Sequence, residues 1–127
     1  MTNNLKYEEI TEFQKDFKRL IRKYPSLPDD FKLAKKAAIE LFHLFKINNF
    51  SVFPIPHFCS EDIQVCKVRK FACKSLKGRG IKSGIRIIYA YHKNPHKAVF
   101  LEIYFKGDKV NEDKDRIKAY LKGHPGA

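Results

Sequence analysis

The stretch that decides the fold is residues 97–106, Lys-Ala-Val-Phe-Leu-Glu-Ile-Tyr-Phe-Lys. Two sets of side chains alternate along it, Val99, Leu101, Ile103 and Phe105 against Phe100, Glu102, Tyr104 and Lys106. Successive side chains of a β-strand point to opposite faces of its sheet. The pattern therefore predicts a strand with one face packed on helices and the other offering polar groups.

Further strands are predicted upstream of this one. Residues 85–92 and 63–74 are rich in β-branched and aromatic residues, and an Asn94-Pro95 turn joins 85–92 to the last strand. Residues 6–10 are predicted to form a short additional strand. Between residues 46 and 62, prolines interrupt an aromatic segment that is either a loop or an edge strand, and no function is assigned to it.

Helical patterns flank the strands. Thr11 and Gln14 form a capping box ahead of apolar residues at helical spacing, and the Pro-rich residues 25–28 end that helix. A second helix starts near Asp29, and the short connection predicts an antiparallel hairpin. Its apolar stripe comprises Phe31, Ala34, Ala38, Leu41, Phe42 and Phe45. Asn111 caps a short last helix that Gly123 ends.

Length and pattern together predict one α+β domain over residues 1–127. We expect an N-terminal helical hairpin packed on a mainly antiparallel four-stranded sheet, with a short C-terminal helix. No internal repeat or second domain is visible in the sequence.

The chain is strongly basic, with 26 Lys and Arg against 14 Asp and Glu and a formal net charge of +12. Such an excess favours nucleic acid, an anionic membrane surface or an acidic protein as partner, without choosing among them. No apolar run is long enough to cross a bilayer and no signal peptide precedes the domain, so we expect a cytosolic protein without a membrane partner. Three cysteines at 59, 66 and 73 match neither a zinc pattern nor a disulfide framework, and we expect free thiols and no metal.

A glycine-rich segment, residues 78–84, superficially suggests a phosphate-binding loop. Ile81 precedes Lys82-Ser83 where a Walker motif has glycine, and a strand rather than a helix follows, so a nucleotide cofactor is not expected. Two interpretations stay open: a flexible hairpin loop, or a loop whose backbone amides follow an RNA backbone together with Arg79 and Lys82.

Cationic side chains recur within the predicted strands. Lys67 and Arg69 share one side of their strand, as do Arg86 and His92 of the next. If Glu102, Tyr104 and Lys106 lie on that same side, the sheet carries a groove suited to phosphodiester cleavage, which needs a base, cationic donors and a proton for the leaving oxygen. Repulsion by neighbouring arginines would favour the neutral Lys67 amine as the base. The alternative is that these cations are ordinary solvent-exposed side chains on the polar face of an antiparallel sheet, with no binding role.

Residues from about 64 to 121 resemble the RelE superfamily of bacterial type II toxins, the RelE-like and HigB-like ribonucleases. The segments that carry the resemblance are residues 67–69, 80–89 and 101–106 and the short terminal helix, and the helical opening of the chain is similar as well. The resemblance implies a small α+β toxin that cleaves mRNA, usually in the ribosomal A site, and that a co-encoded antitoxin holds inactive. It implies no cofactor.

The resemblance also implies roles for individual residues. The implied catalytic residues are Lys67, Arg69, Arg86 and Tyr104, with Glu102 and His92 as possible acid or base. RNA contacts are expected from Arg79, Lys82, Lys106 and Lys74. Two alternatives remain, a ParE-like toxin that inhibits gyrase and a non-catalytic RNA- or ribosome-binding module. The basic strand residues favour the ribonuclease, because a gyrase binder has no need for them to converge.

Overall fold

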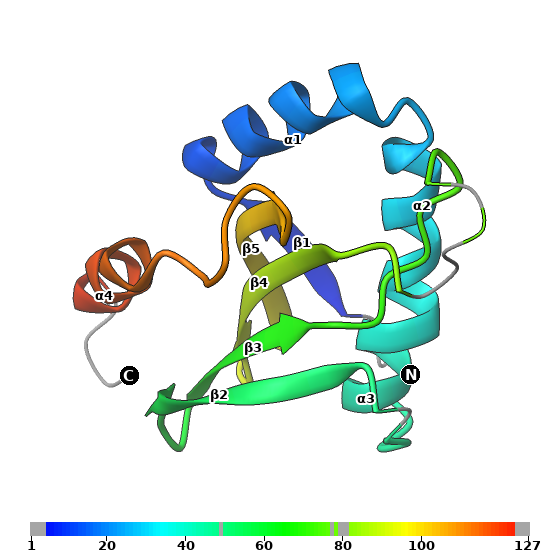
Figure 1. The fold of residues 1–127 in the computed structure, drawn as a ribbon. Coiled ribbons are helices and arrows are strands. Elements are labelled where there is room, and N and C mark those ends of the chain that lie inside the picture. The colour runs from blue at the N-terminus through cyan, green and yellow to red at the C-terminus, as the bar shows by residue number, and fades with distance from the viewer. Residues whose placement is uncertain (1–4, 49, 77, 79–81, 124–127) are drawn as a thin grey trace.

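The computed structural model describes residues 5–48, 50–76, 78 and 82–123 (Figure 1). Its elements are β1 (Lys6–Glu9), α1 (Thr11–Lys23), α2 (Leu27–Ala34), a π-helical stretch (Lys35–Glu40), α3 (Leu41–His43), β2 (Val52–Cys59), β3 (Ile63–Val68), β4 (Ile85–His92), β5 (Lys97–Phe105) and α4 (Lys114–Lys122). The predicted α+β class is confirmed. In the part of the chain that the structure describes, no helix has the length and apolar character needed to span a membrane.

The sheet has five strands in the order β1-β5-β4-β3-β2, so the predicted four-stranded sheet is wrong. β1 runs parallel to β5, and the other neighbours are antiparallel. The extra strand is β2, which occupies the edge and pairs Phe53 with Lys67 of β3. An edge strand tolerates Pro54 and Pro56 because one of its sides makes no ladder hydrogen bonds. β3, which was predicted to extend over residues 63–74, ends at Val68.

The capping box predicted at Thr11 is absent. Thr11 already belongs to α1, and the N-cap is Ile10, which makes no side-chain capping bond. Instead, the Ile10 amide donates to the carbonyl of Phe100 at 3.2 Å. The start of α1 is therefore set by its attachment to β5 and not by a local side chain.

The two long helical segments do not form the predicted antiparallel hairpin. Figure 1 shows α1 crossing above the sheet and α2 running down beside it. Buried Tyr24 and Leu27 anchor the corner, where the Leu27 amide donates to the Tyr24 carbonyl at 3.0 Å. The π-helical stretch then shifts the phase of the apolar stripe, because π-helical hydrogen bonds span one residue more than α-helical ones. Ile39 and His43 are buried, and Phe45, which lies beyond the end of α3, is 64% exposed.

A β-bulge breaks the strict alternation predicted for β5. Ile88 of β4 pairs with Glu102 and Tyr89 pairs with Phe100, which leaves Leu101 as an extra residue. Phe100 and Ile103 therefore both pack under the N-terminal helices, whereas Val99, Leu101 and Tyr104 pack on the opposite face. The sheet has a main core under α1 to α3 and a smaller core under α4.

α4 is capped by Asp113, not by Asn111, since the Asp113 side chain accepts from the Arg116 amide at 3.0 Å. The Arg116 guanidinium reaches Asp16 of α1 at 2.6 Å and the Leu101 carbonyl at 2.9 Å. Ile117 is buried in the smaller core. These contacts place α4 over the half of the sheet near the end of β4 and leave the Arg86 end uncovered.

Replacement of Phe13 by alanine should destabilise the protein by about 3–5 kcal/mol, because its ring is fully buried against Phe31 and Phe100. Urea unfolding followed by circular dichroism measures the loss. Phe45→Ala removes an exposed ring and should change the free energy of unfolding by no more than about 0.5 kcal/mol. Equal losses for the two variants would contradict the burial described here.

Candidate functional site

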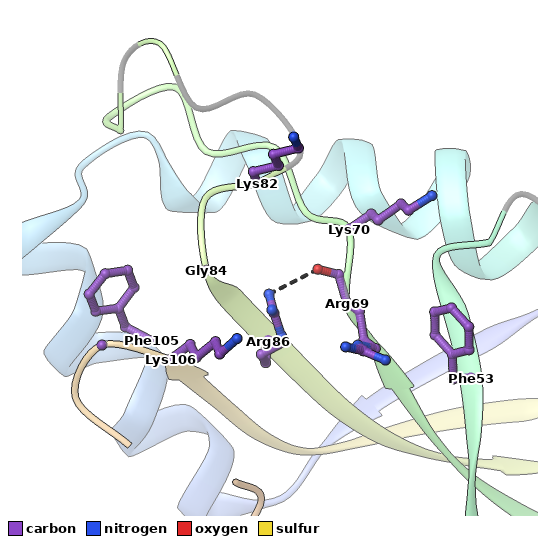
Figure 2. A pocket seen from close by; sticks show the side chains of 9 residues that line it. Phe53, Arg69, Lys70, Lys82, Gly84, Arg86, Phe105 and Lys106 are labelled. Carbon is purple, nitrogen blue, oxygen red and sulfur yellow. Dashed lines mark hydrogen bonds between the residues drawn. The ribbon is translucent and has the colours of Figure 1, made fainter. Parts of the chain in front are cut away.

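An open groove of about 790 Å³ lies where β3, β4 and β5 meet the loops at one end of the sheet (Figure 2). The lining residues are Phe53, Arg69, Lys70, Lys82, Gly84, Arg86, Phe105, Lys106 and Gly107. Five of these nine residues carry a positive charge and none is acidic. The charge of the groove is therefore complementary to a polyanion or a phosphate group.

Strand register determines which predicted residues share a face. Arg86 pairs with Tyr104, and Lys67 pairs with Ile88, which in turn pairs with Glu102. Arg69 follows two residues after Lys67, immediately beyond β3. Directly paired residues of adjacent strands point the same way. The structure thus brings Arg69, Arg86 and Lys106 into the groove, with Lys67, Tyr104 and Glu102 beside it on the same face.

Arg86 is the most constrained cation of the groove. Its Nη1 donates to the Arg69 carbonyl at 2.9 Å and, more weakly, to the Ile85 carbonyl at 3.4 Å. Partial burial and the nearby Arg69 charge lower the pKa of Arg86 below its ordinary value. A bound anion would relieve this repulsion, so the geometry favours occupation of the groove by negative charge.

The loop before β4 shapes the floor of the groove. Gly84 has φ of +88°, and a Cβ on it would lie 3.0 Å from the Phe105 ring. Its carbonyl accepts from the Lys106 amide at 2.8 Å. The buried Ser83 hydroxyl donates to the Phe71 carbonyl at 2.5 Å, which ties the loop to the segment after β3. Lys82 lines the groove, whereas Arg79 lies outside the described residues.

Lys67, which was expected to act among arginines, also has an acidic partner that the sequence did not predict. Its ammonium forms an ion pair with Glu112, Nζ to Oε1 2.6 Å, and Glu112 comes from the loop between β5 and α4. Burial would raise the pKa of the Glu112 carboxyl, but the Lys67 ammonium lowers it below its ordinary value. The pair therefore places a carboxylate and an ammonium together at the border of the groove.

The Tyr104 phenol is close enough to Glu112 and Arg86 for the charges of both to act on it. It is buried, and its hydroxyl has no hydrogen-bond partner among the described residues. Burial, reinforced by the negative charges of Glu112 and Glu102, raises the pKa of Tyr104 to about 12 despite the opposing effect of Arg86. At neutral pH this hydroxyl is a donor that no protein group of the described chain uses.

Glu102 serves the fold and is not a free acid or base. Its carboxylate is buried and accepts from the Asp113 amide at 2.8 Å and from the Lys109 ammonium. These bonds hold the turn that leads into α4. The sequence pattern identifies the carboxylate, but it does not show that the loop after β5 donates hydrogen bonds to it.

His92 and Lys74 are not brought to the groove. His92 lies six residues from Arg86 along β4, roughly 20 Å away, and its Nε2 shares a 2.6 Å hydrogen bond with the Tyr120 hydroxyl. Lys74 follows the end of β3, and its amide donates to Asp30 of α2 at 3.1 Å. Both predicted roles assumed a proximity to the cations that the fold does not provide.

Sequence reasoning missed Phe53, Lys70 and Glu112. Lys70 directly follows Arg69, so extension of that basic run would have found it. Assignment of residues 52–59 to an edge strand would have pointed to Phe53, which pairs with Lys67. No local signal identifies Glu112, because its position depends on how the loop after β5 folds back.

The three cysteines are unbridged. Cys66 and Cys73 both lie in the main core, and β3 ends between them. Among the described side chains, no three His, Cys, Asp or Glu gather closely enough to hold a metal ion.

Comparison with known proteins gives one similarity. No protein-family model matches the chain, and no curated protein matches it. Among solved structures, a chain of the archaeal RelE-RelB complex from Pyrococcus horikoshii is similar, with 12% sequence identity and a TM-score of 0.49 over 81% of this chain and 96% of that one. At this identity and TM-score the likeness carries no argument about function.

The raised pKa of Tyr104 predicts a pH dependence of stability. Its folded pKa of about 12 exceeds the ordinary value of 10.0, so the contribution of the neutral phenol is complete below pH 10 and is lost as the pH rises toward 12. The free energy of unfolding of wild type should fall more between pH 9 and 11.5 than that of Tyr104→Phe. Urea unfolding across this range measures the difference, and parallel losses would contradict the burial of this phenol.

Proposed function

We propose that residues 1–127 form a RelE-like toxin domain that cleaves mRNA in the cytosol, in association with the ribosome, and that a co-encoded antitoxin inhibits. The observation that supports this most directly is the convergence of Arg69, Arg86 and Lys106 in one groove beside a neutral buried phenol. A phosphodiester in this groove would meet cations on several sides.

The reaction in this proposal is attack of an RNA 2′-hydroxyl on the adjacent phosphorus. A 2′-oxygen to phosphorus bond forms and the bond to the 5′-oxygen breaks, which leaves a 2′,3′-cyclic phosphate and a 5′-hydroxyl. The pentacoordinate phosphate gathers negative charge that Arg69, Arg86 and Lys106 would stabilise. Tyr104, whose hydroxyl is buried, pairs with Arg86 across β4 and β5 and would position that arginine toward the phosphate without touching it.

The two proton transfers are assigned to the ion pair at the border of the groove. The Glu112 carboxylate, ionised at neutral pH, would accept the proton of the 2′-hydroxyl. The Lys67 ammonium would give its proton to the leaving 5′-oxygen. This reverses the base role expected for Lys67, because its Nζ lies 2.6 Å from the Glu112 carboxylate, which is the basic member of the pair. The scheme draws all its positive charge from side chains and uses no cofactor.

A non-catalytic RNA- or ribosome-binding module is the second candidate. It is favoured by one observation, that Glu102 and His92, both predicted as possible acid or base, are engaged in other contacts. A ParE-like gyrase inhibitor has no comparable support from the groove.

Expression of the protein should arrest growth with cleaved mRNA, and Arg86→Ala or Lys67→Ala should relieve the arrest. Loss of one transition-state contact typically lowers the rate on the order of 100-fold or more. Primer extension on cellular mRNA locates the cuts, and cleavage should persist in EDTA when ribosomes are kept intact separately. Arg22→Ala, an exposed arginine of α1, is the matched control and should retain the arrest.

Binding without cleavage by the wild type would support the non-catalytic module instead. Intact mRNA accompanied by gyrase-linked DNA breaks would support the ParE-like alternative.

The groove should also bind the antitoxin, because a partner that neutralises its cations blocks substrate and gains electrostatic complementarity. Reversal of both Arg69 and Arg86 to Glu should weaken co-purification of the protein encoded by the neighbouring reading frame. Arg22→Glu reverses one charge on α1, away from the groove, and should leave co-purification unaffected. Unchanged co-purification by the double variant would place inhibition at another surface.

A further inference from the structure

Two exposed phenylalanines extend the groove beyond its cations. Phe50 is 62% exposed and Phe53 is 37% exposed. Each has a cation against its ring: the Arg69 guanidinium lies 5.3 Å from the Phe53 centroid, and the Lys70 ammonium 5.7 Å from that of Phe50. Figure 2 shows Phe53 and Lys70 beyond Arg69, on the side of the groove away from Lys106.

Folding does not account for the exposure of these rings. β2 docks through Val52 and Ile55, which are buried, whereas Phe53 points outward from the same strand. Phe50 adopts φ of 60°, a left-handed conformation that is unfavourable for a bulky residue. Its amide donates to the Asn48 side chain at 2.9 Å, which supports this turn. Strain of this kind is concentrated at functional sites.

We propose that Phe53 and Phe50, together with Arg69 and Lys70, form a stacking platform for unpaired bases of single-stranded RNA. The inference rests on the proposed RNA-binding function and adds a determinant of substrate class. Phosphates of the bound strand lie against Arg86 and Lys106, and the following bases stack on the exposed rings and on the flat guanidinium of Arg69.

Charge and shape together favour this occupant over a protein segment. The surface offers flat aromatic faces and positive charge side by side, and none of the residues lining the groove is acidic. A single-stranded nucleic acid supplies both matching features in every nucleotide, a planar base and a phosphate. A duplex has its bases already stacked on each other, so it gains nothing from the rings.

The test compares two probes of equal charge. One is a short, fluorescently labelled single-stranded RNA with 2′-O-methyl groups, which block attack by the 2′-oxygen. The other is an abasic chain of the same length. Wild type should bind the base-bearing probe more tightly than the abasic one, in a titration followed by fluorescence anisotropy.

Phe53→Leu keeps apolar bulk but removes the ring. It should weaken binding of the base-bearing probe by about 5- to 150-fold and leave the abasic probe unaffected, as expected for loss of base stacking. Phe53→Tyr keeps the ring and should retain wild-type affinity. Phe50→Leu tests the second ring in the same way, with a smaller or equal loss, and circular dichroism checks that each variant is folded.

Two controls separate stacking from other effects. Phe45→Leu removes a ring about as exposed as that of Phe50, which no cation contacts among the described residues. It should change the affinity for neither probe. Arg86→Gln should weaken the binding of both probes, because it removes a phosphate contact that both probes make.

The remaining outcomes distinguish failure of the stacking platform from failure of the proposed function. Equal wild-type affinity for the two probes, or no effect of Phe53→Leu and Phe50→Leu, would overturn the stacking platform while the RNA groove stands. Failure of wild type to bind either probe would overturn the proposed function itself. If the phenylalanine variants lose the neighbouring-frame protein but keep RNA affinity, the rings serve a protein partner and the inference is wrong.

Discussion

The bulge in β5 is the constraint on which the rest of the structure depends. One extra residue at Leu101 lets Phe100 pack with Phe13 and Phe31 in the main core, while Tyr104, four positions later, reaches the opposite face. Without it, a strand of strict period two would keep Phe100 and Tyr104 on the same side. The bulge thus allows one strand to supply the aromatic centre of the core and to place a phenol opposite Arg86.

Division of the second face between α4 and the groove follows from polar contacts. Buried Asp16 and Glu102 would be costly if left unpaired, and each finds partners in or just before α4. These contacts, together with Ile117 in the smaller core, hold the helix over the half of the sheet that contains His92. The Arg86 end stays open because the same attachments keep α4 away from it. A stability requirement on one half of the sheet therefore leaves the other half available to ligand.

The groove concentrates positive charge at a cost to the folded state. Arg86 lies among like charges and is partly buried, and the Arg69 carbonyl compensates only in part through its hydrogen bond. The Phe53 ring beside Arg69 and the Phe50 ring beside Lys70 add favourable cation–π contacts while remaining open to solvent. A surface of repelling cations and exposed rings adds little to the stability of the folded protein by itself. Binding of a polyanion would relieve the repulsion among these cations.

Local pattern by itself determined the α+β class, the central strands at 85–92 and 97–106, and the alignment of Lys67 with Arg69, because each of these depends on neighbours a few residues apart. The predicted alternation of faces along β5 was wrong at Leu101, because a bulge is determined by the partner strand and by packing in the cores on both faces of the sheet. Only the tertiary structure decided that residues 52–59 form an edge strand beside Arg69, that Glu112 pairs with Lys67, and that Glu102 and His92 are engaged away from the groove. Those pairings join positions far apart in the chain, and they are set by register, loop reach and the need to satisfy buried polar groups, which no short stretch of sequence contains.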